Sequence, residues 1–300
     1  MGKLKQFIDN LSSTNRFSWY LSIFRVFLGF HIIKKIYLLW GSQSILLSNG
    51  VLFEHKEMFL DYFGFNSEVV LANSSILLLS IVALSIFMIL GIGRNITVFI
   101  LYFFIKILQD LTYPILNGGD NLMIFVLLYF CFASSFEHLT LYKQKVKTNK
   151  SYLISNLAVY SICFHLGYVY FISAIHKIHA DVWFNGTALY YVMNLERFSS
   201  PISSLFSDNG VITTLGTYFT LLFELLFIFL VWDKKYKVIF LISGIMLHAG
   251  IYFFMMIYDF EIFFVSLYGF FLSNQLYERL AYKANTFLLN FKTQRHAQQA

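Results

Sequence analysis

A lysine flanked by two histidines near the middle of the chain is the pattern best suited to chemistry. His176, Lys177 and His179 close a long apolar run, and a Trp-x-x-Gly turn follows at Trp183 and Gly186. A lysine at the mouth of an apolar helix bundle can lose its proton and act as a general base. It can also extend its ammonium into the lipid headgroups while its stem stays in hydrocarbon. The residues alone leave both interpretations open.

The same segment carries side chains of the types that bind metals. His176 and His179 are three residues apart and Asp181 follows, and all three are ligand types found at transition-metal sites. No further histidine, cysteine or carboxylate falls into register with them, and Cys131 and Cys163 lie alone in separate apolar runs. We therefore predict no metal site.

Other polar residues interrupt apolar segments, where an unpaired ionisable group is costly and usually faces the bundle interior. Glu224 shares one helical face with threonines and would need a partner from another helix. Asp120 opens an apolar segment after the tight turn that begins at Asn117. Several such positions on different helices predict a polar cavity that opens outward, and the candidates that line it are Arg25, Asp120, His165, Glu224 and His248.

Two further groups of charges have simpler interpretations beside the functional one. Lys106 and Asp110 are one helical turn apart, so they form either an internal ion pair or part of a polar wall that faces a substrate. Lys34 and Lys35 fall near the end of the first apolar segment, where long cationic side chains commonly reach the headgroups.

The composition predicts an all-helical protein that crosses a membrane several times. Hydrophobic residues make up 58% of the chain, charged residues 13%, and there are 2 prolines in 300 residues. A helix that crosses about 30 Å of hydrocarbon needs about twenty apolar residues. Eight segments approach that length, the fourth and eighth being short: 19–40, 74–93, 96–116, 121–136, 152–175, 211–232, 237–257 and 260–273.

The distribution of charge predicts that both termini are cytoplasmic. With the N-terminus inside, most lysines and arginines fall in inner segments, and only Lys56, Lys177 and Arg197 fall in outer ones. The net charge of +6 therefore reflects topology, and no basic stripe suited to nucleic acid is present. The first apolar run lacks a small-residue cleavage site, so we expect a retained anchor.

The predicted organisation is a cytoplasmic segment (1–18), a transmembrane domain (19–273) and a basic cytoplasmic tail (274–300). Residues 51–71 and 188–198 mix aromatic and polar side chains, as helices lying on the outer surface of a bilayer do.

Three pieces of the sequence resemble a known family, the horizontally transferred transmembrane domain shared by vitamin K-dependent gamma-carboxylases and their bacterial relatives. They are the Asn117-Gly118-Gly119-Asp120 turn, the stretch from Tyr170 through Lys177, Trp183, Gly186 and Tyr191, and His248 with the phenylalanines that follow it. The number of spans and the inside N-terminus agree with this family.

The resemblance implies that Lys177 is a base that deprotonates a reduced quinone of the vitamin K type at the outer face of a bacterial plasma membrane. Nearby cations, with Lys34, Lys35, His176 and His179 as candidates, would favour the neutral amine. His165 and His248 would assist, and Asp120 and Glu224 would orient or tune the lysine. Trp183, Gly186 and Tyr191 would shape the turn that closes the site.

Departures from the carboxylases give a second hypothesis. His176 stands where they carry a lysine, an extra residue separates Asp181 from Trp183, and no large domain follows the spans. The size is closer to small stand-alone bacterial members, some of which, such as the sporulation-delaying protein B type, act in maturation of a secreted peptide. The alternative is thus a non-catalytic membrane partner for maturation, export or immunity of a secreted peptide.

Overall fold

The structure is a computed structural model that describes residues 2–47, 59, 62, 64, 67–141 and 148–297, and in this part of the chain it is helical without strands. The longer helices are α1 (Gly2–Ser13), α2 (Ser18–Trp40), α5 (Ser74–Leu90), α6 (Asn95–Leu111), α7 (Gly118–Phe130), α8 (Asn149–Ile178), α12 (Gly210–Leu230), α13 (Lys237–Met255), α14 (Tyr258–Leu267) and α15 (Asn274–Ala297). Short helices connect them: α3 (Gln43–Leu46), α4 (Ser67–Ala72), η2 (Tyr113–Ile115), α9 (Asp181–Phe184), α10 (Ala188–Asn194), η3 (Glu196–Phe198), α11 (Ser204–Ser207) and η4 (Tyr268–Phe271).

Three helices, α8, α12 and α13, are long and apolar enough to cross a membrane. Helices α5 and α7 are shorter and apolar. Only 28% of the most apolar window of α12 and 17% of that of α13 is buried inside the protein. Because so much apolar surface would be costly in water, these helices suit contact with lipid.

Each of the eight apolar segments contains a helix, and the limits of the fourth and eighth differ most from the sequence prediction. Helix α7 ends at Phe130, six residues before the predicted limit, and residues 131–139 continue as turns and bends. Its 13 residues span only about 20 Å. The last segment divides into α14 and the 3-10 helix η4. Both differences occur where sequence hydropathy continues past the end of the regular helix.

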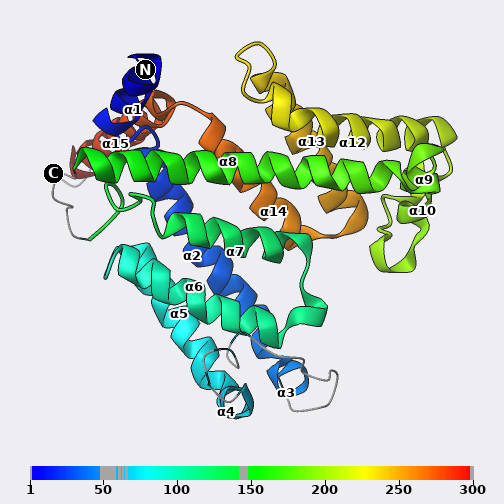
Figure 1. Cartoon of the computed structure of the whole chain (residues 1–300), viewed down its shortest axis with the longest axis horizontal. Helices are drawn as coiled ribbons and strands as arrows, with labels where there is room; N and C mark the ends of the chain where they lie inside the picture. Colours follow the sequence, from blue (N-terminus) through cyan, green and yellow to red (C-terminus); the bar gives the residue numbers. More distant parts are fainter. Residues whose placement is uncertain are drawn as a thin grey trace.

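The helices form two groups that meet at α7 (Figure 1). In one group α2 packs on α5, α5 on α6 and α6 on α7; in the other α8 packs on α12 and α13 packs on α12 and α14. Helix α7 contacts both α8 and α14. Large buried aromatic side chains fill the interior, including Phe24, Phe130, Phe227, Phe263 and Phe264.

The flanking segments pack against the bundle. Helix α1 contacts α8, and α15 contacts α2; in Figure 1 both lie near the start of α8. Of the two predicted surface segments, 188–198 forms α10 and η3, with α10 packed on α12. Most of 51–71 lies outside the described residues, apart from its last part in α4.

Candidate functional site

Lys177 forms an ion pair with Glu224 across the contact between α8 and α12. The lysine lies in the last turn of α8, and its Nζ donates a hydrogen bond to Glu224 Oε1. The Lys177 side chain is 23% exposed and that of Glu224 is 9% exposed. The lysine Nζ also lies 4.7 Å from the centroid of the Trp183 ring, a cation–π contact. The Glu224 carboxylate and the Trp183 indole therefore both contact the Lys177 ammonium.

A tight turn after α8 carries Trp183 back to the lysine. The helix ends at Ile178, and α9 brings the indole toward the last turn of α8. Gly186 follows with φ +72°, and a Cβ there would lie 3.0 Å from side-chain atoms of Thr214 and Tyr218 on α12. The Tyr218 hydroxyl donates to the Phe184 carbonyl at 2.8 Å. The left-handed backbone at Gly186 and the short distances from its Cβ position to α12 both favour glycine here.

The α10 helix is tied to the same face of α12. The backbone N–H of Leu189 donates to the hydroxyl of Thr217 at 3.0 Å, and that hydroxyl donates to the carbonyl of Thr213 at 2.8 Å. Both threonines are buried. Their face of α12, which also carries Glu224, thus docks α10 as well as holding the lysine.

A second polar cluster lies deeper in the bundle, around His248 on α13. His248 Nδ1 pairs with Glu261 Oε2 on α14, and its Nε2 lies 2.5 Å from the Tyr170 hydroxyl on α8. The Tyr170 hydroxyl is 2.7 Å from that of Tyr268. All four side chains are buried. When His248 Nδ1 donates to Glu261, His248 Nε2 accepts from the Tyr170 hydroxyl, which in turn accepts from the Tyr268 hydroxyl. The donors and acceptors of this hydrogen-bonded series are thus matched.

The two clusters adjoin each other. The charge on Glu224 interacts with His248, and that on Lys177 interacts with Glu261. Glu224 Oε2 and Glu261 Oε1 are buried and have no hydrogen-bond partner. Buried polar atoms are nearly always hydrogen-bonded, so two carboxylate oxygens without partners mark this region as able to accept a proton or a donor group.

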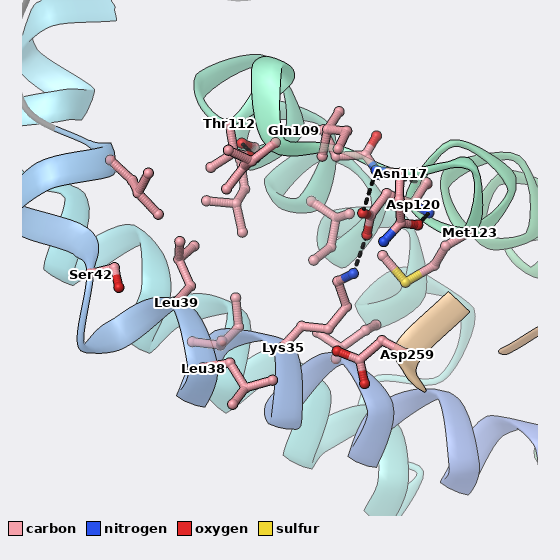
Figure 2. Close-up of a pocket in the computed structure, with 17 residues that line it drawn as sticks. Lys35, Leu38, Leu39, Ser42, Gln109, Thr112, Asn117, Asp120, Met123 and Asp259 are labelled. Carbon is pink, nitrogen blue, oxygen red and sulfur yellow. Dashed lines mark hydrogen bonds and ion pairs between the residues drawn. The ribbon is translucent and has the colours of Figure 1, made fainter. Parts of the chain in front are cut away.

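A third group of charges lines a cavity of about 280 Å³ between α2, α6 and α7 (Figure 2). Lys35 pairs with the carboxylate of Asp120, and Gln109 Nε2 donates to the Asp120 carbonyl at 2.7 Å. Asn117 caps α7 by accepting from the N–H of Asp120 at 3.1 Å. Apolar side chains make up most of the remaining wall, and neither Lys177 nor Glu224 lines it.

The structure therefore surrounds Lys177 differently from the sequence expectation. Nearby cations were expected to favour its neutral amine, but Lys34 pairs with Asp259 at 2.5 Å and Lys35 pairs with Asp120. His176 and His179 are exposed. The group in direct contact with Lys177 is a carboxylate, because the α8–α12 contact brings Glu224 to it.

Two other predicted residues lie apart from the lysine. His165 Nδ1 is 3.0 Å from the Tyr129 hydroxyl of α7, and its ring contacts Phe125. It precedes Lys177 by twelve positions on α8, about 18 Å along the axis. Tyr191 is exposed on α10, with its ring 5.4 Å from that of Tyr190.

Arg25 is fully buried and serves the backbone. Its guanidinium donates to the carbonyls of Ser135, Met88, Ile89, His138 and Leu139. It also lies 4.9 Å from the Phe136 ring centroid. The arginine thus joins the end of α5 to the segment after α7. The residues described around it include no carboxylate paired with it, so carbonyl dipoles offset its charge.

Lys106 and Asp110, the charged residues of α6, pair with each other. Lys106 Nζ lies 2.5 Å from Asp110 Oδ1, the internal pair that their spacing allowed. Among described residues, no three histidine, cysteine or carboxylate side chains are grouped so that they could hold a metal ion.

Sequence reasoning did not select Glu261 or Tyr268 and gave Tyr170 no chemical role. Glu261 follows the apolar run of α13 and stands at the start of the last apolar segment. The turn between α13 and α14 folds it back onto His248. The only sequence signal was a carboxylate at the start of a short apolar segment.

Comparison with known proteins identifies no family. The chain matches no protein-family model, no curated protein and no solved structure.

Proposed function

We propose that the protein is an integral membrane enzyme with carboxylase-like chemistry, in which Lys177 acts as a base on a reduced quinone of the vitamin K type. The observation that carries this proposal is the partly buried Lys177–Glu224 pair, in which Glu224 Oε2 is buried and accepts no hydrogen bond. The resemblance to the horizontally transferred transmembrane domain of gamma-carboxylases supports the same assignment.

The pair offers a route for the proton. In the resting protein the ammonium of Lys177 donates to Glu224 Oε1. Transfer of that proton to Glu224 leaves a neutral amine beside a neutral acid, a state that a low-dielectric site favours more than water does. The free amine then accepts the proton of a quinol hydroxyl and leaves a quinolate anion. Trp183, whose ring covers one side of Nζ, limits access of water to the amine.

The topology that suits this chemistry has eight spans with both termini in the bacterial cytoplasm. The apolar segments α2, α5, α6, α7, α8, α12, α13 and α14 would cross the membrane in turn, and the basic connections fall on one side. Lys177 then lies at the outer end of α8, where a quinol dissolved in the bilayer and a secreted peptide substrate can both reach it.

The test uses purified protein in lipid nanodiscs with reduced vitamin K or menaquinone, oxygen and labelled bicarbonate. We expect quinone epoxide from the wild type and none from Lys177→Ala. Fixation of label into a supplied secreted peptide would assign carboxylation to the enzyme. Absence of epoxide from folded wild-type protein with both quinols would contradict the proposal.

A second candidate is a non-catalytic partner for maturation, export or immunity of a secreted peptide. Exposed aromatic side chains in the short helices that follow α8 favour it: Phe184 is 68% exposed and Tyr191 54%. Such rings are common at peptide-binding surfaces. On this hypothesis only the charge of Lys177 matters, and Lys177→Arg keeps full function in cells.

A further inference from the structure

A larger cavity, of about 860 Å³, lies at the opposite end of α8 from Lys177. The turn after α1, the start of α8, the connection from α12 to α13, and the region of η4 and α15 surround it. Tyr152 on its wall precedes Lys177 by 25 positions on α8, about 38 Å along the axis. The cavity is thus independent of the site proposed above.

One side of this cavity is a continuous aromatic wall. The ring centroids of Phe17 and Tyr160 are 5.6 Å apart, those of Tyr160 and Trp232 are 6.3 Å apart, and those of Trp232 and Phe271 are 5.5 Å apart. Tyrosine and tryptophan rings are enriched where a bilayer meets water, because they are apolar with one polar group. This wall therefore suits the glycerol and first acyl carbons of a lipid.

The cavity wall also carries two cations and two carboxylates: Arg16, Lys237, Glu137 and Glu278. In the part of the chain that the structure describes, neither Arg16 nor Lys237 forms an ion pair. The wall therefore presents both signs of charge to whatever occupies the cavity.

Asparagine side chains orient three of these charged groups. Arg16 Nη2 donates to Asn10 Oδ1 at 2.7 Å. Asn15 Nδ2 donates to Glu137 Oε1 at 2.8 Å, and Asn274 Nδ2 donates to Glu278 Oε1 at 2.8 Å. The bonds to Arg16 and Glu278 leave these two groups with further donor or acceptor positions.

We infer that this cavity binds the headgroup of a zwitterionic, amine-bearing phospholipid of the phosphatidylethanolamine class. The phosphate lies between Arg16 and Lys237, and the primary ammonium donates to Glu278. A choline headgroup has no N–H to donate, and a glycerol headgroup has no cation for that carboxylate. The volume is within the range of small-molecule sites.

Native mass spectrometry of the full chain tests this with phosphatidylethanolamine, phosphatidylcholine and phosphatidylglycerol of identical acyl chains. We expect the ethanolamine lipid to bind most tightly. Replacing both phosphate-binding cations (Arg16→Gln with Lys237→Gln) lowers its affinity about a hundredfold, the loss of two charge-assisted contacts at about 1.4 kcal/mol, or one decade, each. The matched control is Lys234→Gln with Lys235→Gln, which makes the same change of charge on residues that do not line the cavity.

A single variant separates headgroup recognition from folding. Glu278→Gln is expected to weaken binding of the ethanolamine lipid and leave that of the choline lipid unchanged. Equal affinities for ethanolamine and choline lipids in the wild type, or equal losses in the two double variants, would overturn the inference. Competition by soluble glycerophosphoethanolamine at equal concentration would also overturn it, since a free metabolite would then be the better ligand.

Discussion

Removing Lys177 is expected to destabilise the protein more than removing its partner does. In Lys177→Met, the Glu224 carboxylate loses the ammonium that its Oε1 accepts from, at 9% exposure. Truncating one member of a buried pair costs about 3 kcal/mol. In Glu224→Gln, the lysine still lies over Trp183 and is 23% exposed. We therefore expect a cost of about 1 kcal/mol for that variant.

The double variant completes the cycle. Because neither partner is then left charged and buried, its cost is expected to be about 2 kcal/mol, well below the sum of the single costs, which gives a coupling of about 2 kcal/mol. The free energy of unfolding, measured by detergent titration in mixed micelles, gives all four values. Additive costs, or a smaller cost for Lys177→Met than for Glu224→Gln, would refute the reasoning that the carboxylate depends on the lysine.

Three further predictions concern Arg25, the start of α7 and His138. Arg25→Lys loses two of the five N–H groups that donate to backbone carbonyls. It should therefore lower the free energy of unfolding by about 2–3 kcal/mol. An unchanged free energy of unfolding would contradict the role of Arg25 in joining α5 to the segment after α7. Asn117→Ala removes the cap of α7 and should cost about 1 kcal/mol, whereas Asn117→Ser should cost less in the same titration. Burial lowers the pKa of His138, so the unfolded chain binds a proton at this residue more readily than the folded protein does. The free energy of unfolding should therefore fall as the pH drops below about 6.5. In His138→Phe, the fall in the free energy of unfolding between pH 7 and 5 should be smaller.

The sequence predicted where the apolar helices lie and which polar residues interrupt them, because both depend on local composition. It predicted that Glu224 needs a partner from another helix but not that the partner is Lys177. That choice depends on how α8 and α12 pack. Hydropathy also could not locate the end of α7 at Phe130, since the turns that follow are apolar as well.

Ion pairs between residues far apart in the sequence account for the other differences between the predicted and the observed surroundings of the charged residues. Lys34 and Lys35 looked like headgroup lysines, yet each meets a carboxylate from α14 or α7. Glu261 had no predicted role, yet it is buried against His248. A carboxylate at the start of an apolar helix has no local signal that tells which helix it will face.

The most direct test of the central claim compares quinol epoxidation by wild type and Lys177→Arg in nanodiscs, after both are shown to be folded. Guanidinium keeps the charge, the pairing with Glu224 and the contact with Trp183, but it does not give up its proton. The account predicts wild-type turnover and a loss of at least about a hundredfold in Lys177→Arg, the lower end of general-base effects. Equal turnover in the two proteins would contradict the role of Lys177 as the base.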